Sequence, residues 1–273
     1  MAAKQNDETA EGGTVGKALS VLDQVAAFGR PVRFSELLEH SPYPKATLYR
    51  FVQTLVGQGM LAFDAERNVY ALGVRLVRLA HTAWQQSSLA PVARPHVDQL
   101  AVLAGETVHL AQLDAAQVLY VDKRNAAQPI EMYSSAGKVG PAYCTGVGKA
   151  MLAFLPEAEL APILAQQSFH VFTPTTLTSE AALRSELRAI REAGYAFDRE
   201  EHEPGIICVA VPILNAGARP LGAISVTSST ARTSLAALEA LAPDVQSAAE
   251  TIARDAEAWR FPNEIKSNER AGV

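Results

Sequence analysis

The feature that most constrains this fold is a change of hydrophobic periodicity at about residue 73. Before that point, apolar residues recur at helical spacing in three short runs, and a two-strand hairpin pattern closes the segment. After it, residues 74–87 give one more amphipathic helical pattern, and alternating strand patterns are then interleaved with helical runs. A chain of 273 residues, 48% of them hydrophobic, can fill two separate cores.

The order of these patterns predicts an α+β protein with two domains. Residues 14–73 are predicted to form a winged helix-turn-helix, 74–87 a linker helix, and 88–260 a mainly antiparallel sheet flanked by helices. The two polar ends, residues 1–13 and 261–273, lack periodicity and are predicted to be disordered.

Apolar stripes define the expected cores. In the first helix one face carries Val15, Leu19, Leu22 and Val25 or Ala26. In the third helix one face carries Leu48, Val52 and Leu55. In the second domain, six segments have strand character: TVHLAQLD, QVLYVDKR, residues 130–133, YAFDR, GIICVAVPIL and LGAISVTS. Helices are expected between and after these strands, ending with a long one at the end of the domain.

The outer face of the third helix has the chemistry of a DNA-recognition helix. It carries a cation, hydroxyls and an amide that can meet phosphates and base edges, and no acid occurs between residues 40 and 63. Arg67, at the tip of the hairpin, is placed to touch the minor groove or the backbone. The predicted DNA-binding residues are therefore Lys45, Ala46, Thr47, Tyr49, Arg50, Gln53 and Arg67. The alternative is the solvated face of an ordinary helix.

Charge is distributed unevenly along the chain. Residues 14–78 carry eight Lys and Arg against five Asp and Glu, a net +3, whereas the whole chain has a net charge of −5. A mildly basic N-terminal segment followed by an acidic remainder is consistent with separate DNA-binding and sensing domains. No run of eighteen apolar residues and no signal-peptide pattern occurs, so a cytoplasmic protein without membrane contact is expected.

Two motifs suggest a small-molecule site. CTGVGKAM, residues 144–151, fails as a phosphate loop because Tyr143 and Ala150 stand where a glycine and a Ser or Thr are needed. It remains a glycine-rich helix start whose free N–H groups suit a small anion, unless Thr145 simply caps that helix.

The second motif, FDREEHEPGIICVAVPI, begins at Phe197 and contains four acids, one histidine and one cysteine before it becomes apolar. A lone histidine without a second at i+4 argues against a metal site, and Pro204 and Gly205 break any helix. The residues 200–203 are expected to be the solvated rim of a loop. Cys208 lies in an apolar strand, which should raise the pKa of its thiol, so cysteine catalysis is not expected. The two cysteines, Cys144 and Cys208, lie far apart in the sequence and indicate no disulfide. No metal or cofactor is expected either.

Six segments in register resemble the IclR family of bacterial transcription regulators. They are GKALSVLDQVAAFG, PKATLYRFVQTLVGQG, YALG, CTGVGKAMLAFLP, REAGYAFDREEHEPGIICVAVPI and LGAISVT. The resemblance implies a winged-helix domain, a linker helix and a GAF-like effector domain. It also implies dimers that often pair into tetramers, palindromic operators, and a small carboxylic or aromatic acid as effector.

The resemblance also implies which residues hold the effector. They are the amides of Gly146 and Val147, together with Asp198, Cys208, Ser225 and Thr227. Val147 is bulkier than the small residue expected at its position, Thr227 replaces a serine, and Ala46 stands where the family often has a serine. The chain is therefore interpreted as a ligand-responsive transcription regulator and not an enzyme. The alternative is a small-molecule sensor or a cysteine-dependent enzyme without specific DNA binding.

Overall fold

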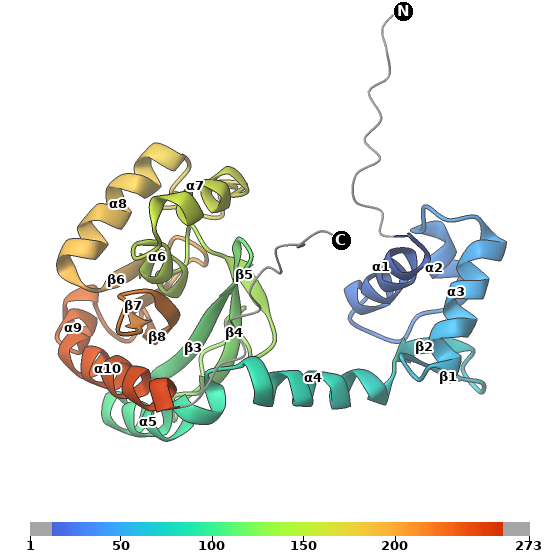
Figure 1. Cartoon of the computed structure of the whole chain (residues 1–273), viewed down its shortest axis with the longest axis horizontal. Coiled ribbons are helices and arrows are strands. Elements are labelled where there is room, and N and C mark those ends of the chain that lie inside the picture. The colour runs from blue at the N-terminus through green and yellow to red at the C-terminus, as the bar shows by residue number, and fades with distance from the viewer. Residues whose placement is uncertain (1–12, 259–273) are drawn as a thin grey trace, which may run out of the picture. The chain divides into compact units, whose positions relative to one another are not determined.

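The computed structural model describes residues 13–258 and divides into two compact units, one up to Ala83 and one from Trp84 onward (Figure 1). The predicted disordered ends lie outside the described residues, except Gly13, which begins the first helix. The N-terminal unit contains helices α1 (Gly13–Ala27), α2 (Phe34–Glu39) and α3 (Lys45–Gly57), and strands β1 (Leu61–Asp64) and β2 (Val69–Leu72). Helix α4 (Val74–Ser87) includes the residues at which the two units meet in the sequence.

The N-terminal unit is a winged helix-turn-helix. Helix α3 starts directly after Pro44 and buries Leu48, Val52 and Leu55, as the apolar spacing predicts. Strands β1 and β2 pair antiparallel to form the wing, and Val32 exchanges both backbone hydrogen bonds with Tyr70, at 2.9 and 2.7 Å. The three helices and the wing therefore share one small core.

The predicted stripe of α1 is correct in its second half and wrong in its first. Leu22 and Val25 are buried as expected, whereas Val15 is 73% exposed and Leu19 49% exposed. Ala18 and Val21 complete the face that packs on the core of this unit.

The C-terminal unit is a six-stranded sheet between two layers of helices. Its elements, in chain order, are α5 (Ala90–Ala104), β3 (Thr107–Asp114), β4 (Gln117–Arg124), β5 (Val139–Pro141), α6 (Gly146–Leu152), α7 (Glu157–Ala165), α8 (Glu180–Ala193), β6 (Ala196–Arg199), β7 (Ile206–Leu214), β8 (Pro220–Ser229), α9 (Leu235–Glu239) and α10 (Ala242–Ala258). The strand order is β5-β4-β3-β8-β7-β6, and each neighbouring pair is antiparallel, which confirms the predicted sheet.

Alternation along the central strands separates two cores. Val209 and Val211 of β7 point to the face covered by α5 and α10, whereas Cys208 and Ala210 point to the face covered by α6, α7 and α8 (Figure 1). The second face is lined by small side chains, among them Ala111 and Ala223, so α6 can approach the sheet closely. This close layer contains the candidate site.

The strand predicted at residues 130–133 does not form. The strand that pairs with β4 at this end of the sheet is β5, which joins it through residues 117–119, and residues 130–133 belong to no strand. The backbone N–H of Tyr133 donates instead to the Glu203 carboxylate, at 2.9 and 3.0 Å to its two oxygens. A side chain thus replaces the ladder that the pattern suggested.

No helix among residues 13–258 is long and apolar enough to cross a membrane.

Candidate ligand pocket and nucleic-acid interface

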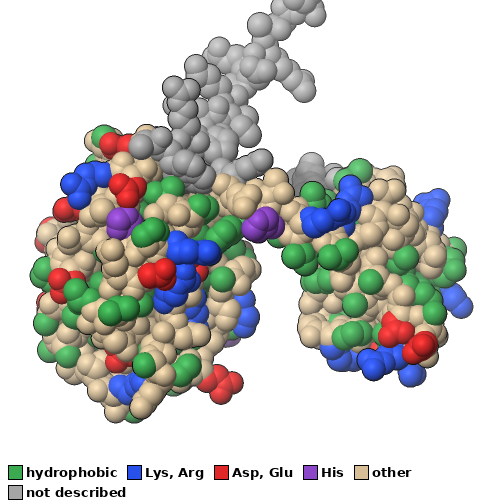
Figure 2. Space-filling model, turned by 90° about the horizontal axis from the view of Figure 1, so that it is seen from below, with side chains coloured by type: hydrophobic (Ala, Val, Ile, Leu, Met, Phe, Trp, Pro, Cys, Tyr) green, Lys and Arg blue, Asp and Glu red, His purple; other side chains and the backbone are tan. Residues whose placement is uncertain are grey.

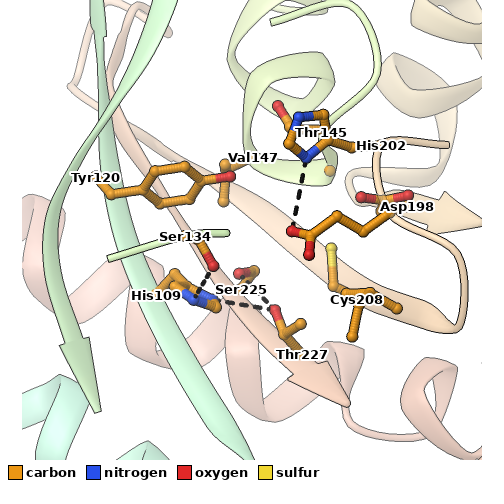
Figure 3. Close-up of a pocket in the computed structure, with 13 residues that line it drawn as sticks. His109, Tyr120, Ser134, Thr145, Val147, Asp198, His202, Cys208, Ser225 and Thr227 are labelled. Carbon is orange, nitrogen blue, oxygen red and sulfur yellow. Dashed lines mark hydrogen bonds and ion pairs between the residues drawn. The ribbon is translucent and has the colours of Figure 1, made fainter. Parts of the chain in front are cut away.

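A small cavity of about 30 Å³ lies between helix α6 and the sheet of the C-terminal unit (Figure 3). All six residues that the sequence assigns to an effector line it. The complete lining is His109, Tyr120, Ser134, Thr145, Gly146, Val147, Asp198, His202, Glu203, Ile206, Cys208, Ser225 and Thr227. A site for one ordered water needs roughly 10–15 Å³, so this cavity is polar but tight.

The register of the sheet explains why residues far apart in the sequence converge. Asp198 of β6 is paired with Cys208 of β7, and Cys208 is paired with Thr227 of β8. Two positions earlier along β8, Ser225 is paired with His109 of β3. Directly paired residues of an antiparallel sheet point to the same face, and so do residues two positions apart on one strand. These side chains therefore form one polar surface on the sheet.

Gly146 begins α6 against this floor. A Cβ at Gly146 would lie 2.4 Å from the Cys208 sulfur, so only glycine allows the helix start to approach β7 this closely. Thr145 does not cap the helix, because its hydroxyl donates to the Pro141 carbonyl at 2.8 Å. The first N–H groups of α6, at Gly146 and Val147, have no intrahelical acceptor and adjoin the cavity.

The loop after β6 is not the solvated rim that the sequence suggests. Glu201 is only 3% exposed, and its carboxylate pairs with the ammonium of Lys149, which is fully buried on α6. Lys149 also lies 3.5 Å from Glu186 of α8, which binds Arg199 at 2.7 Å. The prediction failed because the partner cation is 52 positions away in the sequence and belongs to a motif that looked like a glycine-rich loop.

Three threonines of residues 173–176 hold the same loop from outside. The Thr173 and Thr175 hydroxyls donate to the Glu200 carbonyl at 2.6 and 2.9 Å, and the Thr176 hydroxyl donates to the Glu201 carbonyl at 2.7 Å. The loop that carries His202 and Glu203 to the cavity is therefore fixed on both sides. The run of hydroxyl residues is visible in the sequence, but nothing there indicates its target.

Sequence reasoning missed the polar wall formed by His109 and Ser134. The His109 ring contacts the Ser134 hydroxyl through Nε2 at 2.8 Å and the Thr227 hydroxyl through Nδ1 at 3.1 Å, and Thr227 lies 3.3 Å from the Ser225 hydroxyl. Figure 3 shows this chain on one side of the cavity and Asp198 and Cys208 on the other. Strand alternation in TVHLAQLD could have placed His109 on the inner face.

The electrostatics of the cavity favour neutral groups. Burial, and then the nearby Glu201 charge, raise the pKa of Asp198 to about 7, although the Glu201 amide donates to its carboxylate at 2.8 Å. Burial, and then the Lys123 charge, lower the pKa of His109 to about 3. At neutral pH His109 is therefore uncharged.

Neither cysteine is suited to nucleophilic chemistry. Burial raises the pKa of Cys208 to about 12 and raises that of Cys144 as well, so the thiolate is scarce in both. Among residues 13–258 no group of three or more His, Cys, Asp and Glu side chains is arranged to hold a metal ion.

Six of the seven residues predicted to bind DNA are exposed in the N-terminal unit. On α3, Lys45, Ala46, Arg50 and Gln53 are exposed, Tyr49 is 52% exposed, and Thr47 is half-buried. The Tyr49 ring rests edge-on against Phe34 of α2, with centroids 5.7 Å apart. Arg67 is 81% exposed in the turn between β1 and β2 and lies 3.9 Å from the Asp64 carboxylate. On the visible face of this unit, Figure 2 shows more Lys and Arg than Asp and Glu.

Comparison with known proteins gives matches to both units. A family described as the IclR helix-turn-helix domain matches residues 14–65, and one described as the bacterial transcriptional regulator IclR C-terminal matches residues 81–254. The chain is 32% identical over 241 residues to the HTH-type transcriptional regulator XynR of Escherichia coli K12, covering 88% of this chain and 96% of XynR.

Solved structures give the same result. The IclR of Thermotoga maritima is 31% identical, with a TM-score of 0.71 over 88% of this chain and 97% of its own. An IclR homolog from Microbacterium hydrocarbonoxydans, complexed with 4-hydroxybenzoate, shares the fold at 23% identity, with a TM-score of 0.77 over 90% of this chain and 100% of its own.

Proposed function

The chain belongs to the IclR family of bacterial transcriptional regulators, and we propose that it binds a palindromic operator as a homodimer and senses a small carboxylic or aromatic acid. It is a DNA-binding regulator with a ligand-binding C-terminal domain, not an enzyme. The bounds proposed for its parts are 14–73 for the winged helix, 74–87 for the linker helix and 88–260 for the effector domain. Because its proposed target is bacterial DNA, we place the protein in the cytoplasm.

One observation carries the proposal for the sensing site. Six residues, from α6 and from three strands, converge on one small cavity and leave amides, hydroxyls, a carboxyl and a thiol facing it. Backbone amides and hydroxyls can bind a carboxylate without an arginine, at the modest affinity that a sensor needs. Asp198, with its raised pKa, can be neutral when an anion is present.

The size of the cavity favours a short acid over a larger one. At about 30 Å³ it is filled in part by Val147 and by the Tyr120 ring, which both line it. A ring such as that of 4-hydroxybenzoate, bound by the Microbacterium homolog, would require these side chains to move. Aromatic acids therefore belong in the test as the less favoured class.

Exposed apolar residues in the N-terminal unit support the homodimer. Val15 of α1 is 73% exposed, and Val74 and Val77 of α4 are 73% and 67% exposed. Large apolar side chains at helical spacing on two helices of one small domain are what a partner surface requires. A twofold dimer of winged helices reads two half-sites of opposite orientation, hence a palindrome. Molar-mass measurement in solution decides between a dimer and a tetramer.

Replacing Arg50 by alanine should weaken operator binding about tenfold or more and reduce the salt slope by about one per subunit, because one cation facing phosphate or a guanine edge is lost. The operator is first selected from random duplex DNA with the wild-type protein, and affinities are then measured by gel shift at several salt concentrations. Arg188→Ala is the matched control, since it removes the same charge from an exposed position of the other unit. Equal affinity of the two variants would exclude α3 as the recognition helix.

An effector at ten times its Kd should stabilise the C-terminal unit by about 1.4 kcal/mol, because it binds the folded state alone. A thermal-shift screen with short oxo and hydroxy acids, aromatic acids and sugar acids checks this. Thr227→Val should abolish the shift, whereas Thr251→Val, on α10 and away from the cavity, should keep it. The absence of any shift across all three classes would refute the acid-sensing proposal.

A further inference from the structure

The wing of the N-terminal unit carries little charge that could hold phosphate. Residues 61–72, which form β1, β2 and the turn between them, contain one cation, Arg67, against two acids, Asp64 and Glu66. Arg67 is also tied to Asp64, because its backbone N–H donates to that carboxylate at 3.1 Å and its guanidinium lies 3.9 Å from it. A hairpin with one cation and two acids gains little from the phosphate backbone. Any large contribution of the wing to operator affinity must therefore come from uncharged surface.

Phe63 supplies such a surface. Its side chain is 43% exposed, and it belongs to β1, the strand of the wing that adjoins α3 (Figure 1). Leu61, two positions earlier, points to the same face of the hairpin and is buried in the core of the unit. Phe63 therefore continues the core-facing side of the wing beyond the edge of the core, toward the turn.

A row of side chains joins Phe63 to the outer face of α3. The Phe63 ring packs on that of Tyr70, its partner in the hairpin, with centroids 4.8 Å apart. Tyr70 is buried and hydrogen-bonds the Gln53 side chain, and burial, followed by the nearby Tyr49, raises the pKa of the Tyr70 hydroxyl. Gln53 and Tyr49 are both exposed on the face of α3 that is predicted to meet base edges. Phe63 therefore lies on a surface that is continuous with the predicted recognition residues.

We propose that Phe63 is a further DNA-contacting residue, whose ring packs against the sugars and base edges of the minor groove next to the half-site read by α3. This inference rests on the proposed operator binding. Apolar side chains serve other DNA-binding proteins in the minor groove in a comparable way. An uncharged ring displaces no counterions from DNA, so its contribution to affinity does not depend on salt, unlike that of Arg50.

The first test measures the affinity of full-length Phe63→Ala for the operator selected by the wild-type protein. Affinity should fall about tenfold, and by the same factor at every salt concentration. Phe63→Leu should keep most of the affinity, because leucine also presents an apolar surface to the groove. Phe172→Ala is the matched control and should bind as the wild type does, since it removes an equally exposed ring, at 42%, from the C-terminal unit. A Phe63→Ala affinity within about twofold of wild type, or a loss that shrinks as salt rises, would overturn the inference.

Hydroxyl-radical footprinting locates the contact, because this reagent cleaves DNA at sugars that are accessible from the minor groove. Wild-type protein should protect sugars that flank each half-site, and Phe63→Ala should lose that protection while it keeps the protection over the half-sites themselves. Protection lost over the half-sites instead would show that Phe63 only supports Tyr70 and Gln53, which contradicts the inference. An operator bound equally by both proteins would refute the Phe63 contact and leave operator binding standing. If wild-type protein selects no DNA, operator binding is itself wrong, and the inference with it.

Discussion

Replacing Lys149 by methionine should lower the free energy of unfolding of the C-terminal unit by about 3–5 kcal/mol. Lys149 is fully buried and its ammonium pairs with Glu201, which is 3% exposed. Removing the cation leaves a carboxylate in a site where water cannot solvate it, and one of its oxygens already has no hydrogen-bond partner. The loop after β6, and with it the cavity, would lose its main attachment to α6.

Denaturant unfolding followed by tryptophan fluorescence measures this loss. No tryptophan precedes Trp84, whose ring stacks on Arg94 and donates to the Val121 carbonyl at 3.0 Å within the C-terminal unit. The double variant with Glu201→Gln should recover at least half of the loss, since the buried charge is then absent. Arg219→Met, which breaks an exposed pair with Glu159, should cost less than about 1 kcal/mol. A similar small cost for Lys149→Met would mean that the buried pair is not structural.

Local periodicity was enough to predict most of the fold. Leu48, Val52 and Leu55 of α3 are buried as their spacing predicts, and the alternation of β7 places Cys208 and Val209 on opposite faces. These features depend on residues within a few positions of one another. The strand expected at residues 130–133 does not form, because a strand also needs a partner, and a local pattern does not show that the Tyr133 N–H would be bound by the distant Glu203 carboxylate.

The candidate site was predictable only in part, and for a related reason. Gly146, Asp198 and Ser225 came from motifs of a recognised family, whereas His109 enters the cavity because its strand lies next to β8 at one particular register. The ion pair between Lys149 and Glu201 likewise joins two motifs. Each motif could be interpreted without the other, so the sequence did not indicate that they meet. Conspicuous charge near residue 201 suggested solvent exposure, but a buried partner reversed that conclusion.

Whether the cavity can bind an anion depends on the protonation state of Asp198. Asp198 faces the cavity, and Lys149 lies close enough to lower its pKa, but burial and the Glu201 carboxylate outweigh that effect. An anionic effector would add a second negative charge beside Asp198. The site can accept it most easily when Asp198 carries a proton, so effector binding and protonation should be linked.

Effector affinity should therefore fall as the pH rises above about 7, approaching tenfold per pH unit, or about 50-fold between pH 7 and pH 9, because half of Asp198 is still protonated at pH 7 and about one part in a hundred at pH 9. The sign follows from the raised pKa: below about 7 Asp198 is mostly neutral, and above it the ionised carboxylate repels the acid unless a proton is taken up. For the same reason Asp198 destabilises the folded unit progressively as the pH rises from about 4 to about 7, because the unfolded carboxyl ionises near 3.8.

Calorimetry in two buffers of different ionisation enthalpy measures both the affinity and the proton taken up on binding. The probe is the acid from the thermal-shift screen with the largest effect, which stays ionised from pH 6 to pH 9. Asp198→Asn keeps the shape of the side chain without the charge, and its affinity for the same acid should change little over this range. A wild-type affinity that is flat from pH 6 to pH 9, with no proton uptake, would mean that the Asp198 carboxyl does not share the cavity with the effector carboxylate. A fall that persists in Asp198→Asn would assign the linkage to another group.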